Sequence, residues 1–458
     1  MILRIHDTYQ RTKVDFVPHD ATHVQFYVCG PTVYDYAHIG NARPIVVFDV
    51  LFRLLQRLYP KVTYVRNITD IDDKINARSA ETGEPISEIT ARTTAQFHED
   101  IVALNALPPT VEPRATDHVA EMIVMIEDLI AKGHAYAAEG HVLFNVPSWD
   151  EYGRLSRHSR DELVAGARVD VAPYKKDAAD FVLWKPSTKN LPGWDSPWGW
   201  GRPGWHIECS AMASKYLGDV FDIHGGGQDL IFPHHENEIA QCLCDKPSEG
   251  FSKYWMHNGY LMSEGEKMSK SLGNFYTINE LLREYPGEAV RLLLLKTHYR
   301  QPLDFTKSGL DEAKRELDRF YGALRGLNVP RVEGDPADAV VEPLTDDLNT
   351  PLALSALHAS LRDLNNVADP DGQSVAAQSL MCSASVLGLI EQDPEDWFRW
   401  RPANAGGLDD DAIEDLVRQR TGARVAKDFA TSDRIRDELA EAGIVLEDKP
   451  DGTIWRRG

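Results

Sequence analysis

Cysteine is scarce in this sequence, with five residues among 458, an odd number at irregular spacing. That pattern excludes a disulfide framework and favours a reducing compartment. The N-terminal segment 1–7 also lacks the apolar stretch that is typical of a secretory signal peptide. We therefore expect a cytoplasmic protein.

Long apolar runs are missing as well. The four leucines at 292–295 are bounded by Arg291 and Lys296, whereas a helix that crosses a bilayer needs roughly 20 apolar residues. We expect no association with a membrane. Hydrophobic residues make up 43% of the chain and charged residues 26%, as in ordinary globular proteins. A single core does not grow to this length, so we expect about three domains.

Positive charge is in short supply. The 49 lysines and arginines face 71 aspartates and glutamates, which gives a net charge of −22. Such a chain repels phosphate overall, which argues against indiscriminate binding to nucleic acid. A folded RNA can still dock on a local basic surface, helped by Mg²⁺ and by contacts to its bases. A specific RNA partner therefore remains open.

The N-terminal third has the pattern of a parallel α/β sheet. Alternating apolar residues at 24–29 predict a strand, a helical pattern follows over 45–58, and a second strand is predicted at 62–65. Strand, helix and strand in this order open a Rossmann-like fold. Open sheets of this kind bind ligands at the carboxyl ends of their strands.

The character of the sequence then changes several times. A passage rich in Pro, Gly and Trp at 186–204 closes an insertion, a helical pattern begins beyond residue 310, and helices at 411–421 and 424–442 lead to two short strands. We expect an α/β catalytic domain over 1–111 and 201–254, an inserted domain over 112–200, a loop region over 255–310, a helical bundle over 311–400, and a small mixed α/β domain over 401–458.

Four separated residues form a candidate metal site: Cys29, Cys209, His234 and Glu238. His234 and Glu238 are four apart, so they share one face of a helix. Two thiolates, an imidazole and a carboxylate make a plausible zinc set, and such a site suits the recognition of sulfur. A lone cysteine is more often a small buried hydrophobic residue, and Cys242, four residues after Glu238, is a rival ligand.

Two short motifs suggest a nucleotide. His38-Ile39-Gly40-Asn41 follows the first strand, where Gly40 allows close approach to the backbone and a helix N-terminus favours phosphate. Alone it is equally an ordinary loop before a helix. The second motif, Lys267-Met268-Ser269-Lys270-Ser271, lies between glycines. It is a solvated turn or, with two ammonium groups, a means of neutralising a triphosphate.

The two motifs, in this order and on either side of an insertion, resemble those of class I aminoacyl-tRNA synthetases. The passages 27–34, 204–212 and 221–238 are similar to those of the cysteinyl-tRNA synthetase family, and the resemblance extends to the C-terminal segments 427–430 and 452–455. It implies a ligase that uses ATP with Mg²⁺ to convert L-cysteine to cysteinyl-adenylate. The amino acid then passes to the 3′-terminal adenosine of tRNA(Cys).

The resemblance also implies roles for individual residues. Cys29, Cys209, His234 and Glu238 would hold one Zn²⁺ per subunit, which binds the substrate thiolate and so distinguishes cysteine from serine without editing. Four protein ligands usually close a zinc site, so the substrate requires a fifth coordination position or an exchanged ligand. His38, Gly40, Asn41, Lys267 and Lys270 would hold the nucleotide.

Further positions come from the same resemblance. The expected cysteine pocket consists of Thr69, Trp205, His224 and Asp229, and the expected anticodon contacts are Arg424, Phe429, Asp433 and Asp448. Other interpretations remain open. Trp205 is alternatively a core residue, and Asp229 a helix cap. The expected anticodon residues are alternatively solvated charges on a helix, with Phe429 in the core. His235 lies off the helix face of His234 and is expected behind the ligands.

Two alternative functions remain. A relative that joins cysteine to an amino sugar in mycothiol synthesis is expected to lack the C-terminal domain, which continues here through Trp455. A zinc-stabilised RNA-binding protein without enzymatic activity would have no use for a triphosphate loop. We expect a monomeric tRNA ligase. Cysteine-dependent ATP–pyrophosphate exchange, run beside serine and an amino-sugar acceptor, distinguishes the three.

Overall fold

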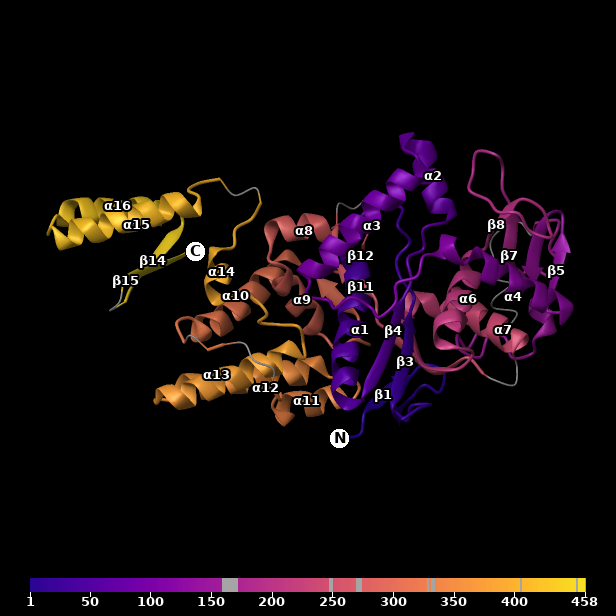
Figure 1. Cartoon of the computed structure of the whole chain (residues 1–458), viewed down its shortest axis with the longest axis horizontal. Helices are drawn as coiled ribbons and strands as arrows, with labels where there is room; N and C mark the ends of the chain where they lie inside the picture. Colours follow the sequence, from indigo (N-terminus) through magenta and orange to yellow (C-terminus); the bar gives the residue numbers. More distant parts are fainter. Residues whose placement is uncertain are drawn as a thin grey trace.

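A computed structural model describes residues 1–158, 172–246, 250–268, 274–327, 329–330, 334–403, 406–449 and 452–457. Its centre is a parallel sheet of four strands in the order β10-β9-β3-β4. The strands are β3 (His23–Val28), β4 (Lys61–Arg66), β9 (Phe221–Gly227) and β10 (Ser252–Asn258). The predicted parallel α/β fold is confirmed, with β3 and β4 side by side in Figure 1. The carboxyl ends of β3 and β9 also lie side by side.

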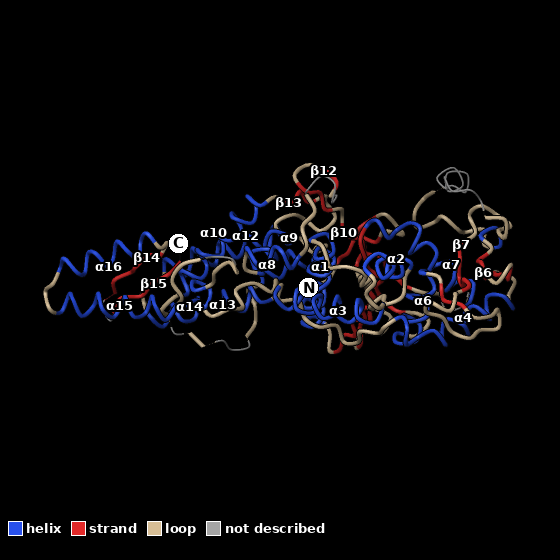
Figure 2. Tube along the Cα trace, turned by 90° about the horizontal axis from the view of Figure 1, so that it is seen from above, coloured by secondary structure: helices blue, strands red, loops and turns tan. Residues whose placement is uncertain are grey.

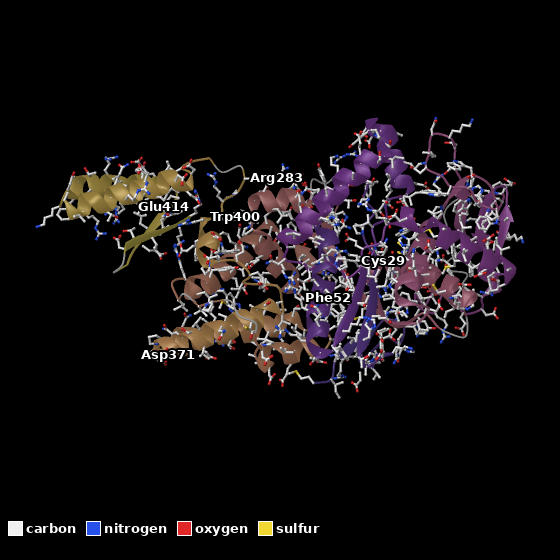
Figure 3. All side chains as sticks on the ribbon, in the orientation of Figure 1. Cys29, Phe52, Arg283, Asp371, Trp400 and Glu414 are labelled. Atoms are coloured by element: carbon white, nitrogen blue, oxygen red, sulfur yellow. The ribbon has the colours of Figure 1, made fainter. Side chains whose placement is uncertain are left out.

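Helix α1 (Ile39–Leu58) packs against this sheet. Phe52, labelled in Figure 3, contacts the rings of Phe26 on β3 and Tyr64 on β4. The helix begins six residues before the predicted start at residue 45. Pro44 lacks an N–H and disfavours a helical residue before it, so a pattern of apolar residues does not reveal this first turn.

The chain between β4 and β9 forms helices and a second sheet. The helices are α2 (Asp73–Thr82), α3 (Ile86–Ala103), α4 (Val119–Ala131) and α6 (Trp205–Leu217). The sheet is antiparallel, in the order β5 (Ala135–Ala138), β6 (His141–Phe144), β7 (Phe181–Pro186) and β8 (Gly201–Pro203). Strand β8 leads directly into α6, which brings Cys209 back to the central sheet.

After β9 the chain returns to the sheet and then becomes helical. Helix α7 (Glu236–Asp245) precedes β10. At the N-terminus, β1 (Arg4–Asp7) and β2 (Thr12–Asp15) form a hairpin that packs beside β10. A three-stranded sheet contains β11 (Leu261–Ser263), β12 (Glu266–Lys267) and β13 (Leu303–Phe305). The helices that follow are α8 (Ile278–Glu284), α9 (Gly287–Leu295), α10 (Lys307–Leu324), α11 (Asp338–Thr345), α12 (Thr350–Asn366), α13 (Pro370–Ser385) and α14 (Pro394–Arg399).

The C-terminal unit contains α15 (Asp410–Val425), α16 (Phe429–Glu441), β14 (Ile444–Lys449) and β15 (Gly452–Arg457). Arg424 belongs to α15, whereas the sequence pattern assigned it to the following helix. Lys427 has a left-handed φ of 58° that ends α15, and the Asp428 carboxylate caps α16 by accepting from Thr431 N at 3.1 Å. The catalytic region, the helices and this unit follow one another along the long axis (Figure 2).

Two features of the core bear on function. One apolar cluster runs without a break from the central sheet through α1, α9 and α10 into α12 and α13. The C-terminal unit has a separate small core, formed by Ile413, Val417, Ile435, Leu439, Ile444 and Trp455. Among the described residues, no helix combines the length and the apolar character that a bilayer crossing requires.

Candidate metal and nucleotide site

The four predicted metal ligands lie together at the carboxyl edge of the central sheet. Cys29 directly follows β3, and its Sγ is 3.5 Å from Cys209 Sγ on α6 and 3.5 Å from Glu238 Oε1 on α7. His234 Nε2 lies 3.1 Å from the same Oε1. The four donor atoms are all within 4.8 Å of one another. Residues more than 200 positions apart in sequence are therefore assembled into one donor cluster.

Burial makes this cluster suited to a cation. His234 and Glu238 are almost fully buried, and burial raises the pKa of the Cys29 and Cys209 thiols and lowers the pKa of His234. A neutral imidazole keeps a lone pair for a metal, and His234 Nε2 makes no hydrogen bond among the described residues. Buried sulfur, nitrogen and carboxylate donors without another role fit a zinc ion.

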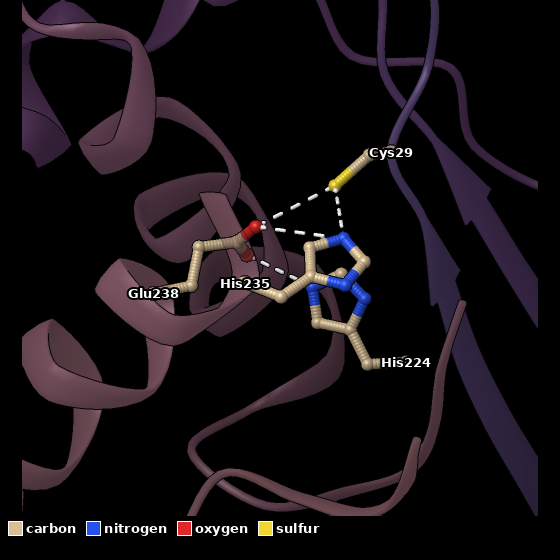
Figure 4. A group of neighbouring side chains, drawn as sticks. All are labelled: Cys29, His224, His235 and Glu238. Atoms are coloured by element: carbon tan, nitrogen blue, oxygen red, sulfur yellow. Dashed lines mark hydrogen bonds and ion pairs between the residues drawn. The ribbon is translucent and has the colours of Figure 1, made fainter. Parts of the chain in front are cut away.

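A second donor set shares two of these residues. His235 Nε2 lies 3.3 Å from Cys29 Sγ, and His224 Nε2 lies 2.8 Å from Glu238 Oε2, so Cys29, His224, His235 and Glu238 also satisfy the distance requirement (Figure 4). The helix periodicity directed His235 away from the ligands. His235 precedes Glu238 by three residues, a spacing that also shares a helix face, and its Nε2 lies 4.0 Å from Glu238 Oε1.

Other histidines support the cluster from outside. His235 Nδ1 lies 2.7 Å from His257 Nε2, and His257 Nδ1 lies 2.8 Å from Thr8 Oγ1. On the opposite side, His206 Nδ1 lies 3.0 Å from His234 Nδ1. Isolated histidines in a strand or at the start of a helix carry no distinguishing pattern, so His206 and His257 were not predictable from the sequence.

The predicted cysteine pocket surrounds the donors. Trp205 stacks on the His234 ring with centroids 4.1 Å apart, and 37% of its surface is exposed, which contradicts core packing. His224 is fully buried, and its ring stacks on Trp255 with centroids 4.5 Å apart. Asp229 lies exposed on the short turn η3 (Gln228–Leu230), and its carboxylate caps no helix among the described residues.

Thr69 belongs to a buried polar network that joins β3 to β4. Its Oγ1 accepts from Asn67 Nδ2 at 3.0 Å and donates to Glu208 Oε2 at 3.3 Å. Asn67 Oδ1 accepts from Gly30 N at 2.8 Å, next to Cys29. Burial raises the pKa of Glu208 well above its usual range. Asn67 and Glu208 were not among the predicted site residues. The only indication in the sequence is that they lie next to predicted ones, Asn67 near Thr69 and Glu208 before Cys209.

The described parts of the two predicted nucleotide motifs lie next to each other. The His38 N–H donates to Asn41 Oδ1 at 3.0 Å at the start of α1. The chain after the lysine-rich motif runs alongside, with Ile39 N donating to Tyr276 O at 3.0 Å. A Cβ on Gly40 would lie 2.9 Å from the His38 ring and 3.4 Å from Met268 Cε, so glycine is needed for this approach.

Much of the second motif lies outside the described residues. Lys267 ends β12, and its side chain lies outside the described residues. Lys270 lies entirely outside them. The remaining three cysteines, Cys242, Cys244 and Cys382, are buried and belong to neither donor set.

The predicted anticodon residues lie on the C-terminal unit. Phe429 is 64% exposed, so it is no core residue. Asp448 pairs with Arg424 at 2.8 Å and accepts two bonds from Arg420, at 2.8 and 2.9 Å. These partners, Arg420 first, hold the pKa of Asp448 far below its usual value. Asp433 pairs with Arg436 at 3.0 Å.

Comparisons with protein families divide the chain into three parts. The model of tRNA synthetases class I (C) catalytic domain matches residues 15–315, the DALR domain matches 339–391, and the cysteinyl-tRNA ligase anticodon binding domain matches 407–456. The cysteine–tRNA ligase of Rhodospirillum rubrum is 61% identical over 464 residues and that of Paramagnetospirillum magneticum is 60% identical over 461, each covering 100% of both chains.

Solved structures show the same fold at low identity. A Mycobacterium tuberculosis methionyl-tRNA synthetase in complex with methionyl-adenylate has a TM-score of 0.55 and 16% identity, covering 80% of this chain and 89% of that one. The LeuRS of Agrobacterium radiobacter K84, in a ternary complex with tRNA and LeuAMS, has a TM-score of 0.60 and 12% identity. That alignment covers 94% of this chain and 89% of the other.

Proposed function

The chain belongs to the cysteine–tRNA ligase family of class I aminoacyl-tRNA synthetases and joins L-cysteine to tRNA(Cys), and we propose that a zinc ion at Cys29 selects the amino acid. The observation that supports this most directly is the buried cluster of four donor atoms within 4.8 Å. The family match to an anticodon binding domain over 407–456 argues against the amino-sugar ligase, and the full-length relatives argue against a protein that only binds RNA.

The zinc ligands in this proposal are Cys29, Cys209, His234 and Glu238, rather than the set that contains His224 and His235. Two thiolates suit zinc better than one, and this set lies beside the partly exposed Trp205. When bound, the ion supplies a soft Lewis-acid centre that prefers sulfur to a hydroxyl group. His224 holds Glu238, and His235 holds Cys29, in the way that outer partners orient metal ligands.

Selectivity against serine follows from this chemistry. Serine and cysteine are nearly isosteric, and a purely apolar pocket distinguishes such pairs weakly. Trp205 covers the side chain of the substrate, Thr69 meets its backbone, and the exposed Asp229 carboxylate receives the α-ammonium group. His224 contributes through Glu238, because it is fully buried.

Activation of cysteine requires no covalent nucleophile from the protein. The carboxylate of cysteine attacks the α-phosphate of ATP with Mg²⁺, and pyrophosphate leaves. His38 and Asn41 steady the charge that develops on the phosphate, Gly40 allows the nucleotide to approach, and Lys267 and Lys270 draw off the pyrophosphate. The 2′-hydroxyl of the terminal adenosine of tRNA then takes the cysteinyl group. Catalysis consists of positioning and electrostatic stabilisation.

The remaining parts of the chain serve the tRNA. We propose that Arg424, Phe429, Asp433 and Asp448 lie at the anticodon, with the exposed Phe429 ring as a stacking surface. The protein acts as a cytoplasmic monomer with one zinc per subunit. The proposed domains are 1–111 with 201–254 for catalysis, 112–200 as the insertion, 255–310 for the loop and stem contacts, 311–400 as the bundle, and 401–458 for the anticodon.

ATP–pyrophosphate exchange tests the proposed selection. We expect exchange with cysteine and near silence with serine, and comparable exchange with both would contradict the zinc model. Cys209→Ala should lose both zinc, measured by mass spectrometry, and exchange. Cys242→Ala, a matched change on α7 outside the donor set, should retain both. Charging assays with tRNA(Cys) and with an amino-sugar acceptor complete the test.

A further inference from the structure

The C-terminal unit meets the rest of the protein across a sparse interface. It has its own core, and Figure 3 shows Glu414 in this unit far along the molecule from Cys29. A groove of about 820 Å³ separates α10 from the β14–β15 hairpin. Its walls include Arg319 and Gly322 on α10 and Glu447 and Arg456 on the hairpin. Few packed side chains therefore determine the angle between the two bodies.

Arginines cross this interface at two points: Arg399 on α14 pairs with Glu414 on α15 at 3.1 Å, and Arg325 reaches the hairpin from the end of α10. Arg325 follows the last turn of α10 and is 9% exposed. Its Nη2 donates to the carbonyl oxygen of Trp455 on β15 at 2.8 Å, and its Nη1 lies 3.6 Å from Glu447 Oε2 on β14. Within the described residues, every hydrogen bond and ion pair between the end of α10 and the hairpin involves Arg325.

The same guanidinium also binds α14. Nε and Nη2 of Arg325 donate to the two carboxylate oxygens of Glu395 at 2.7 and 2.8 Å, and its guanidinium lies 5.0 Å from the centre of the Phe398 ring. A planar fork with several N–H donors is required for this three-way contact, and lysine lacks it. Arg325 therefore joins α10, α14 and both strands of the hairpin at one point.

On its other side, α10 is tied to the catalytic domain. The Tyr321 hydroxyl donates to Glu288 Oε2 on α9 at 2.8 Å. Arg291, also on α9, pairs with Asp49 on α1, the helix that begins next to His38. Because these contacts are fully buried, α1, α9 and α10 form one rigid body. Arg325 stands at the far end of that body.

We propose that Arg325 is a positioning residue for tRNA charging, which fixes the anticodon-binding unit at the angle that lets tRNA reach both the anticodon site and the active site. The proposal rests on the anticodon role of the C-terminal unit. Without Arg325, Glu395 and Glu447 lose the cation between them, so α14 and β14 present like charges to each other. The unit then samples other angles, and a tRNA bound at one end misses the other.

Arg325→Ala tests the proposal in the full-length enzyme. We expect ATP–pyrophosphate exchange with cysteine to stay within about twofold of the wild type, because the amino acid site is unchanged. The kcat/KM for charging tRNA(Cys) should fall about 10- to 100-fold, the range that misplacement by a remote substitution produces. Penalties for anticodon-substituted tRNA should shrink at the same time. Lys314→Ala is the control, because it removes an ion pair with Asp318 inside α10.

Two further variants keep the test decisive. Arg325→Lys keeps the charge without the fork, so it should charge tRNA poorly, and the exchanged pair Arg325→Glu with Glu395→Arg should recover part of the loss. Small-angle X-ray scattering should show a broader distribution of distances for Arg325→Ala. Wild-type charging by this variant, or an equal loss of exchange and charging, would overturn the positioning role. If cysteine-dependent exchange falls and the selectivity against serine changes at the same time, the failure lies in the proposed amino acid site rather than in the position of the C-terminal unit.

Discussion

Trp205 and His234 stack with ring centroids 4.1 Å apart and an angle of 19° between their planes. His234 contributes its Nε2 to the donor cluster, and its Nδ1 faces His206 Nδ1 at 3.0 Å. A half-exposed indole therefore covers one face of a buried ligand. The residue that we propose as a substrate contact thus also packs against a proposed metal ligand.

Trp205→Ala should raise the KM for cysteine by about tenfold in pyrophosphate exchange, because an aromatic contact of this kind contributes about 0.5–1.5 kcal/mol beyond its buried area. Zinc should dissociate faster, which a chromogenic chelator measures. Trp205→Phe should recover most of both effects. Trp200→Ala is the matched control, since Trp200 is also exposed but contacts none of the donors. An unchanged KM in Trp205→Ala would exclude the proposed cover.

Zinc affinity should depend steeply on pH. Burial raises the pKa of the Cys29 and Cys209 thiols, so both are protonated in the metal-free protein near neutral pH and release protons on binding. The lowered pKa of His234 keeps its imidazole neutral, so it releases none. Between pH 6 and 8, log K should therefore rise by about two per pH unit.

Competition with a chelator at several pH values measures this slope. The variant Cys209→Asp should reduce it to about one, because only one thiol remains to lose a proton. A slope near three in the wild type would mean that His234 is charged before metal binds. A slope near zero would place both sulfurs outside the metal site.

Asp49→Ala should lower the stability of the catalytic domain by about 3–5 kcal/mol, as removal of one partner of a buried ion pair does. The substitution removes the counter-ion of both Arg291 and Arg53. Arg291 is completely buried, and burial already lowers the pKa of its guanidinium. Urea unfolding followed by near-UV circular dichroism measures the loss. The exposed pair of Arg418 and Asp415 on α15 provides the control, and Arg418→Ala should change stability by less than about 1 kcal/mol.

Phe429→Ala should weaken recognition of tRNA without weakening the fold. Stacking of a base on an aromatic ring contributes about 1–3 kcal/mol, so the KM for tRNA(Cys) should rise about 5- to 150-fold. The ring is 64% exposed, and therefore the melting temperature should stay close to that of the wild type. Val425→Ala removes a more exposed apolar side chain nearby and should affect neither quantity. Equal KM values for both variants would remove Phe429 from the anticodon site.

The sheet follows local rules and was predicted from them, whereas the full donor set rested on the family resemblance, because Cys29 and Cys209 lie 180 positions apart. Strand periodicity identified β3 and β4, and the spacing of His234 and Glu238 placed them on one helix face. His235 escaped this reasoning because only the four-residue spacing was considered, although residues three apart, such as His235 and Glu238, also share a helix face. Pro44 similarly concealed the first turn of α1.

Contacts between distant segments were beyond any local pattern. Nothing in the sequence around Arg325 distinguishes it from the arginines of α10. The role proposed for it depends on Glu395 and Trp455, which lie 70 and 130 residues further along the chain. The same holds for His257, which approaches His235 only because β10 lies beside β9. Which polar side chains become buried partners depends on how whole elements pack.

The 3.5 Å between the sulfurs of Cys29 and Cys209 has a chemical cost when the site is empty. Two thiols in van der Waals contact need to approach by about 1.5 Å to form a disulfide of about 2.05 Å, so oxygen or peroxide can join them. A resident cation prevents this by occupying both lone pairs. Enzyme from which zinc has been removed, when stored in air, should therefore fail to bind zinc until a reductant cleaves the disulfide.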